Sequence, residues 1–521
     1  MSHALHHRLR ALAGFAASSP WVVPSFLAVL VSLLWWPAGE AILESWDDSR
    51  WVIRNPVRNL AARDGLRAIL LPHDGAWYPT TQALTWLLSL ASSSAEQFAL
   101  HLRWTTSLLA GASTLLLYSC LRAEGAGKGW AAFLTSAILC HPHRVENFAW
   151  ASNLRDALAL TLLLATVRAW QAHKGSWVLL AIGALGAKTM VGLVPLALPF
   201  LPSRRSHRGF PRLMMLYVAI TATTLLWARK VYEGVATTHC SLGDSLWETL
   251  PMSACVQVQH GLGFLVPTAP SAIPAPLPLC TRSPSLLRGL LLVGLVGATV
   301  VSLRSERLRF PILWAMLVLA PVTGIASPLA FPVAWRYGLW VEVGVVLALS
   351  GLSLPVLSRK VRPVLALLSS LLILFFIFHS LSGKKMWSDD LQLWEYSHSR
   401  NSSWEVKHNL AGVVWDSGDR VRAHSLLNES AALAPHEVVV RASQAFAYAL
   451  EASWPPAAAI GVKDGMMAAA EDPDRLRLLL KTRWVQSSPA IQRLLREQIK
   501  DAEAGWTASR RCAFHRRQSI E

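Results

Sequence analysis

The polar residues best suited to chemistry in this chain stand at the ends of hydrophobic segments. The stretch HPHRVENFAWASNLRD, residues 141–156, lies between two apolar segments, and ESWDDSRW, residues 44–51, follows the first apolar segment. Carboxylates can accept protons and cations can stabilise negative charge. A charged side chain at a membrane boundary is costly unless it is paired or faces a polar cavity. Clusters of this kind are therefore interpreted as functional sites. The two clusters predict a membrane enzyme with its chemistry on one face of the bilayer.

The composition indicates a membrane protein. Hydrophobic residues make up 53% and charged residues 16% of the 521 positions, and the mean hydropathy is +0.35, too apolar for an ordinary soluble protein. The net charge of +17 does not indicate a nucleic-acid partner, because no long basic stripe carries it. A spanning helix needs ~20 apolar residues. The candidate spans are residues 21–43, 99–121, 129–140, 156–171, 212–228, 285–303, 310–327, 338–357 and 364–382, together with the apolar block 176–201.

Short basic loops orient these spans. The loops containing Lys174 and Arg204 both belong to the basic, cytoplasmic side, so block 176–201 must cross an even number of times. It is predicted to be a hairpin of two short spans that turns near Gly186–Gly192. We therefore expect an all-α polytopic protein of about eleven transmembrane helices in the cell (inner) membrane, with the N-terminus inside and the C-terminus outside. This topology puts the following residues at the outer face: Asp47, Asp48, His141, Glu146, Lys188 and Arg336.

Two further apolar segments are too short or too broken to span. Residues 80–93 are predicted to form a helix in the membrane interface, with Leu84, Leu87 and Leu88 turned to lipid. Residues 251–276 are interrupted by Gly and Pro, and both a re-entrant or surface helix and a covering loop fit them.

The composition changes after Ser382, which divides the chain into a membrane domain, residues 1–382, and a helical domain, residues 383–521. The second domain contains one unit with tetratricopeptide spacing, in which small and apolar residues let two antiparallel helices pack. That unit comprises Asn409, Leu410, Ala411, Gly418, Asp419, Ala423, Leu427 and Pro435. Any other soluble helical hairpin is the alternative. Residues 474–500 are predicted to form a final helix, and a chain ending near Ser382 is expected to keep a folded membrane body.

Four motifs together resemble one protein family. They are WDDSRWVIRNP at 46–56, HPHRVENFAWASNLRD at 141–156, GAKTM at 186–190 and AWRYGLW at 334–340. In order and type they are similar to those of the bacterial relatives of the TMTC (transmembrane and tetratricopeptide-containing) O-mannosyltransferases, within the GT-C glycosyltransferase class. The resemblance covers nearly the whole chain, and HPHRVENFAW is its most specific part.

The resemblance implies a reaction at the outer face. Such enzymes move a sugar, here mannose-like, from a polyprenyl-phosphate donor to a protein or other acceptor. The acceptor hydroxyl is a weak nucleophile and needs a base, for which Asp48 is the first candidate and Asp47 the second. The same two carboxylates would be the ligands of a divalent metal if the reaction uses one.

The resemblance also implies a set of substrate-binding residues. The leaving lipid phosphate needs cations, and Lys188, Arg336 and Arg144 could supply them. His141 and Glu146 would orient these groups or the sugar. The expected set is His141, Arg144, Glu146, Lys188, Arg336 and Tyr337. Each of these residues also has a purely structural interpretation. Lys188 could be a snorkelling lysine, and Arg336 with Tyr337 an interfacial anchor pair. The two aspartates, Asp47 and Asp48, could belong to a solvated turn.

The chain departs from the family where two carboxylates would stand. The family has Glu after the Lys and Glu before the Arg, and this chain has Thr189 and Trp335 instead. Two alternatives to a protein glycosyltransferase therefore stay open. One is a transferase of the same class acting on a lipid or polysaccharide; the other is a non-catalytic membrane scaffold with a tetratricopeptide interaction domain.

Overall fold

The computed structural model describes a helical protein. The described residues are 19–37, 48–53, 55, 57–58, 60, 62–71, 77–201, 210–233, 250, 254, 272–273, 285–319, 335–350, 361–434, 437–451, 459, 462–463, 466, 473–481, 483–486 and 488–503. Within these residues every regular element is a helix and no β-strand occurs. The predicted all-α fold class is confirmed at this level.

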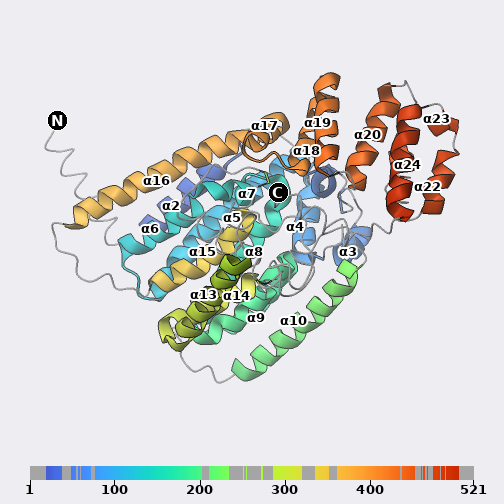
Figure 1. Cartoon of the computed structure of the whole chain (residues 1–521). Helices are drawn as coiled ribbons and strands as arrows, with labels where there is room; N and C mark the ends of the chain where they lie inside the picture. Colours follow the sequence, from blue (N-terminus) through green and yellow to red (C-terminus); the bar gives the residue numbers. More distant parts are fainter. Residues whose placement is uncertain are drawn as a thin grey trace.

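The body is a bundle of helices that occupy the predicted apolar segments (Figure 1). They are α2 (Val22–Trp35), α5 (Ala95–Ala123), α6 (Lys128–Leu139), α8 (Leu154–Gln171), α9 (Trp177–Ala187), the 3-10 helix η4 (Thr189–Phe200), α10 (Phe210–Glu233), α13 (Ser285–Arg304), α14 (Glu306–Leu319), α15 (Trp335–Ser350) and α16 (Val361–Met386). Helix α5 packs against both α2 and α8. A Cβ at Gly111 of α5 would lie 2.1 Å from Ser32 Oγ and 3.0 Å from the backbone oxygen of Ala28 in α2, so glycine at this position lets α2 and α5 approach closely.

The predicted hairpin at 176–201 is present as α9 followed by η4, which pack against each other. The chain changes direction at Lys188, where the backbone is extended, inside the predicted turn. Pro195 and Pro199 lie within η4. Each lacks a backbone N–H donor and opposes a regular α-helix, which explains the 3-10 form of the second arm.

Two helices have the length and hydropathy of a membrane span among the described residues, namely α5 and Pro363–Met386 of α16. Shorter apolar helices are Val22–Trp35, Trp177–Ala187, Thr189–Phe200, Pro211–Leu226, Leu292–Val301 and Leu308–Val318. The count of eleven spans stays a prediction. Only 11% of the most apolar part of α16 is buried, and side chains such as Leu367, Leu374 and Phe378 are exposed. The apolar surface of α16 therefore does not belong to a protein core.

The predicted interfacial segment forms α4 (Pro79–Leu90), beside the shorter α3 (Ala62–Leu70). Leu87 is exposed as expected, but Leu84 and Leu88 pack against a small core that includes Phe98 and Leu102. That part of the orientation was wrong, because α5 covers this side of α4. The buried side chains of α4 are polar: Thr81, Gln82, Thr85 and Ser89. Of residues 251–276 only Ala254, Ala272 and Ile273 lie within the described part of the chain.

The C-terminal helices gather at one end of the body (Figure 1). They are α17 (Asp390–Arg400), α18 (Trp404–Asp416), α19 (Arg420–Leu433), α20 (Val438–Glu451), α22 (Pro473–Leu480), α23 (Arg483–Gln486) and α24 (Pro489–Glu503). Helices α18 and α19 form the predicted hairpin, with Leu410, Ala411, Ala423 and Leu427 buried, while Pro435 lies outside the described residues. Gly418 makes the turn at φ +95°, and Asp419 caps α19. The single helix predicted for 474–500 was wrong, since Pro489 starts a new helix.

One hydrophobic core runs from the body into α17–α19. It joins bundle residues to Trp387, Leu393, Trp394 and Leu410, whereas a separate core occupies α20–α24. Helix α16 continues beyond Ser382 to Met386. The change in composition at Ser382 therefore lies inside a helix, and the hydrophobic packing continues past it.

Candidate functional site

The segment between α6 and α8 is folded into short helical turns. It contains the 3-10 turn η2 (Pro142–Arg144), α7 (Val145–Phe148) and the 3-10 turn η3 (Ala151–Asn153), and nearly every residue in it is buried. His141 begins it, and its Nδ1 accepts a hydrogen bond from the backbone N–H of His143 at 3.3 Å. Pro142 suits a first helical position because it has no N–H to satisfy there. These turns bring the polar side chains of the segment together.

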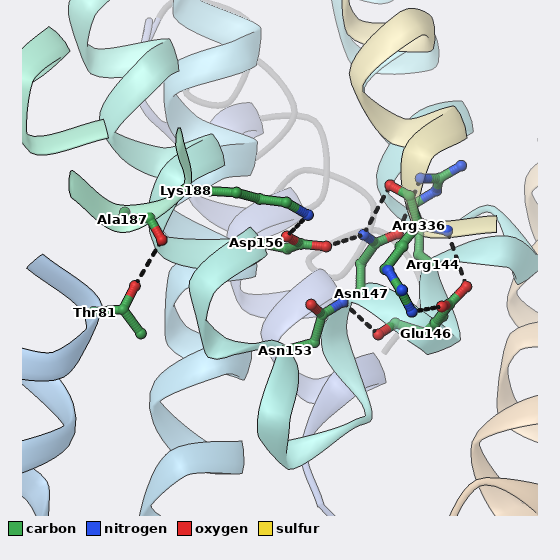
Figure 2. Close-up of polar contacts among 9 residues, drawn as sticks. All are labelled: Thr81, Arg144, Glu146, Asn147, Asn153, Asp156, Ala187, Lys188 and Arg336. Carbon is green, nitrogen blue, oxygen red and sulfur yellow. Dashed lines mark hydrogen bonds and ion pairs between the residues drawn. The ribbon is translucent and has the colours of Figure 1, made fainter. Parts of the chain in front are cut away.

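Lys188, at the α9–η4 junction, forms an ion pair with Asp156 in the first turn of α8 (Figure 2). Both side chains are buried. Thr81 of α4 donates a hydrogen bond to the carbonyl of the neighbouring Ala187 at 3.0 Å. Helix α4 therefore supports the turn that carries the lysine.

Arg336, in the first turn of α15, binds Glu146 twice. Its Nη1 lies 2.5 Å from Glu146 Oε1, and its backbone N–H donates to Glu146 Oε2 at 2.9 Å. Asn153 holds the same segment, since its Nδ2 donates to the backbone carbonyl of Glu146 at 2.8 Å. Glu146 is therefore held by both its side chain and its backbone.

Arg144 forms a third pair, with its Nη2 lying 2.7 Å from Glu342 Oε1 of α15. Its Nη1 donates to Asn147 Oδ1 at 3.1 Å. The Nδ2 of Asn147 in turn donates to Asp156 Oδ2 and to the backbone carbonyl of Arg336, each at 3.3 Å. Asn147 thus connects all three ion pairs, as Figure 2 shows for most of the set.

The cluster contains equal numbers of paired cations and carboxylates and is almost fully buried. Three cations face three carboxylates, and the side chains of Arg144 and Asp156 have no exposed surface. Breaking a buried pair by removing one partner leaves an uncompensated charge, which typically costs about 3–5 kcal/mol. The geometry of the site therefore depends on keeping both members of each pair.

Asp48 lies beside this cluster. It is 1% exposed, and its Oδ1 accepts hydrogen bonds from the backbone N–H of Ser152, at 3.0 Å, and from the Ser152 hydroxyl. Ser152 precedes Asn153, which holds Glu146, so the first-loop carboxylate contacts the same folded segment as the ion pairs. Asp47 lies outside the described residues.

Tyr337 and His141 take different positions around the cations. The Tyr337 ring lies 5.2 Å from the Arg336 guanidinium carbon and 5.6 Å from Lys188 Nζ, so it contacts two of the expected phosphate-binding residues. The His141 ring instead packs edge-on against Phe376 of α16, with centroids 4.9 Å apart. His141 is thus held both by aromatic packing and by its hydrogen bond with the backbone of His143.

Sequence reasoning missed three members of the network as site residues: Asn147, Asp156 and Glu342. Asp156 and Asn147 belong to the charged stretch 141–156, and Asp156 is part of the motif that resembles the family, but neither was among the expected site residues. A signal for Glu342 was present, because a carboxylate six positions after Arg336 interrupts an otherwise apolar helix.

Thr189 and Trp335 stand where the family's pattern has Glu, but Lys188 and Arg336 still have carboxylate partners. Asp156 pairs with Lys188, and Glu146 pairs with Arg336. Thr189 is buried, and nothing is described of the Trp335 side chain. The segment 141–156 thus supplies both acidic partners.

Among the described residues, no group of three or more His, Cys, Asp or Glu side chains is arranged to hold a metal ion. With Asp47 outside this set, the Asp47–Asp48 metal site stays a prediction. Comparison of the sequence with protein-family models and with curated proteins gives no match.

Proposed function

We propose that the chain is an integral-membrane glycosyltransferase of the GT-C class, related to the TMTC O-mannosyltransferases. It moves a mannose-like sugar from a polyprenyl-phosphate donor to a protein or other acceptor at the outer face of the cell membrane. The observation that carries the proposal is the set of three buried ion pairs around Asn147, one of which joins residues 198 positions apart. Apolar residues of similar volume often stabilise a fold as well as a buried pair does. Charged residues in an apolar bundle are therefore better explained by a function than by stability.

The exposed surface of the bundle supports placement in a membrane. Helix α16 combines high hydropathy with little burial, and α10 and α13 also expose apolar side chains such as Met215, Leu226 and Val293. Exposed apolar surface on this scale is costly in water and suits lipid. The proposed topology follows from the basic loops.

The proposed reaction needs a base and an anion-stabilising group. The acceptor hydroxyl attacks the anomeric carbon while the bond from that carbon to the phosphate oxygen breaks. The lipid phosphate leaves with the electron pair, and Asp48 takes the hydroxyl proton. The two hydrogen bonds from Ser152 hold the Asp48 carboxylate in one orientation. Lys188 and Arg336, both beside Tyr337, stabilise the charge that grows on the phosphate.

The test is a transfer assay on the full chain in nanodiscs with a polyprenyl-phosphate sugar, read by intact mass spectrometry of acceptors. Asp48→Asn keeps the shape but removes the proton acceptor, and should lower the rate by ~10²–10⁴-fold. Asp64→Asn, at an exposed position in α3, is the matched control and should keep the wild-type rate. Wild-type turnover in Asp48→Asn would reject this base.

The acceptor class needs a separate measurement. Intact glycoproteins and glycolipids from a deletion strain are compared with those of the parent by mass spectrometry. Loss of sugar from proteins supports the proposal, and loss from lipid or polysaccharide alone favours the related transferase.

A non-catalytic scaffold is the second candidate, because each of the three buried cations already has a carboxylate partner. A deletion strain with unchanged glycans, together with no transfer by the purified chain, would favour the scaffold.

A further inference from the structure

One side of helix α16 faces the bundle, although much of the helix surface is exposed and apolar. Residues three or four positions apart lie on the same side of a helix. The side chains on the bundle side follow this spacing and are Phe376, Ser380, Lys384 and Trp387. Leu374 and Phe378, at other positions around the helix, are exposed. Helix α16 therefore combines an exposed apolar surface with a row of residues that contact the bundle.

The first three residues of this row hold backbone and ring positions beside the ion-pair cluster. Phe376 packs against the ring of His141, and Ser380 Oγ donates a hydrogen bond to the backbone carbonyl of Cys140 at 2.8 Å. Lys384 Nζ donates to two backbone carbonyls at the C-terminal end of α2, at 2.8 and 2.9 Å. A lysine is well placed there, because the last carbonyls of a helix lack partners within the helix. Helix α16 thus holds the start of the charged segment.

The fourth residue of the row reaches one of the cations. The Trp387 and Trp150 ring centroids are 5.9 Å apart, and both side chains are 1% exposed. The Arg336 guanidinium carbon lies 5.8 Å from the Trp150 ring centroid. Trp150 therefore contacts both α16 and the arginine that binds Glu146.

Trp387 also belongs to the C-terminal part of the chain. It follows the last residue of α16 and precedes α17, which continues the path of the chain into the C-terminal helices (Figure 1). It shares one core with Trp394 of α17 and Leu410 of α18. Buried side chains are close-packed, so removal of the Trp387 ring would give Trp150 room to move. The C-terminal helices are thereby connected to the ion-pair cluster through two buried rings.

We propose that Trp387 is a positioning residue that holds Trp150, and through it Arg336, in the place where Arg336 stabilises the leaving phosphate. The inference rests on the proposed function and adds how the C-terminal helices act on that site. A cation placed on a ring keeps its position only while the ring itself is held by packing. Trp387 acts through Trp150.

The first test is hydrogen exchange of the full chain in detergent, read by mass spectrometry of peptides. Trp387→Leu should speed exchange at least about three-fold in residues 141–153 and 335–339, because both segments lose a packing support. Trp387→Phe keeps a smaller ring and should fall between Trp387→Leu and the wild type.

Trp177→Leu is the matched control. Trp177 is also 1% exposed and lies in the same core, where its ring centroid is 5.3 Å from that of Trp170. The variant therefore removes an equal ring and an equal kind of contact from another part of the bundle. Exchange in residues 141–153 and 335–339 should stay at the wild-type rate.

The second test separates positioning from a loss of folded protein. In the transfer assay, Trp387→Leu should raise the KM for the polyprenyl-phosphate sugar about three- to ten-fold, the usual effect of disturbing one cation–ring contact. The KM for the acceptor should not change. A smaller folded fraction would lower kcat and leave both KM values as they are, which is the result expected for Trp177→Leu.

The outcomes separate this inference from the proposed function. Unchanged exchange in residues 141–153 and 335–339 of Trp387→Leu would overturn the inference alone, and so would faster exchange with an unchanged donor KM. If the Leu variant does not fold, the smaller shifts of Trp387→Phe give the same decision. A wild-type chain without transfer activity would overturn the proposed function and the catalytic part of the inference, and exchange would still decide whether Trp387 holds the two segments.

Discussion

Three ion pairs of the body differ in burial and in sequence separation from two exposed ion pairs of the C-terminal helices. The side chains of Lys188–Asp156, Arg336–Glu146 and Arg144–Glu342 are at most 12% exposed, and these pairs join separate parts of the bundle. Arg422–Glu395 and Arg477–Glu503 instead join neighbouring helices, and all four of their side chains are more than a third exposed. Exposed pairs contribute little to stability, whereas breaking a buried pair is costly. The comparison shows that the three pairs of the body place charge where its removal must disturb the surrounding structure, whereas the two exposed pairs do not.

The largest expected effect concerns the boundary between these two regions. A chain ending at Ser382 loses the last turn of α16 together with Trp387 and Trp394, which are 1% and 0% exposed in the shared core. Each large aromatic lost from a core costs about 3–5 kcal/mol. We therefore expect this truncation to aggregate in size-exclusion chromatography, contrary to the expectation from composition. A chain ending at Leu433 keeps α17–α19 and should elute as a single species; equal behaviour of the two truncations would contradict the shared core.

The next effect tests the buried pairs directly. Arg144→Met leaves Glu342 as an unpaired buried charge and should lower the free energy of unfolding by about 3–5 kcal/mol. The double variant Arg144→Met/Glu342→Leu removes both charges and should recover most of that loss. Thermal unfolding in one detergent measures all three proteins. A double variant less stable than Arg144→Met would show that the pair itself stabilises the fold.

A smaller effect depends on pH and lies in the C-terminal helices. Burial, with a contribution from the Lys463 charge, lowers the pKa of His408 from 6.5 to about 4, and its Nε2 lies 2.9 Å from Ser443 Oγ of α20. Between these values the unfolded chain binds a proton that the native chain does not. Stability should therefore be full above about pH 6.5 and fall by about 1–3 kcal/mol as the pH drops towards 4.

The matched variant for this pH dependence is His408→Gln, which keeps a polar side chain but cannot titrate. Its unfolding midpoint, followed by circular dichroism from pH 7.5 to 4.5, should change less with pH than that of the wild type. The same slope in both proteins would exclude His408 as its source.

The smallest effect is expected at an exposed pair. Arg477→Gln removes the contact with Glu503 between α22 and α24. The change in the free energy of unfolding should stay within about 0.5 kcal/mol and shrink further at high salt. A loss comparable to that of Arg144→Met would remove the distinction between the two regions.

Much of the fold could be predicted because it depends on local patterns. The apolar runs predicted the positions of helices such as α5 and α16, and the tetratricopeptide spacing predicted the helix pair α18–α19, whose turn is formed by Gly418. The partial burial of Leu84 and Leu88 could not be predicted in the same way, because it depends on how α5 packs back over α4 and on core residues such as Ala151 and Leu154 from farther along the chain. The extent of the core past Ser382 also depends on contacts between distant helices.

For the candidate site, the residue types and the chemistry they permit were determined by the sequence alone. It identified Asp48, Arg144, Glu146, Lys188 and Arg336 as charges at the ends of apolar segments, where charge is costly and therefore informative. Only the tertiary structure decided which charge meets which, because ion pairing requires separations of a few ångströms between side chains that stand up to 198 positions apart. That is why Asn147 was overlooked: a neutral amide in a short connecting segment has no distinctive pattern in the sequence, and its contacts to the three ion pairs exist only in the folded chain.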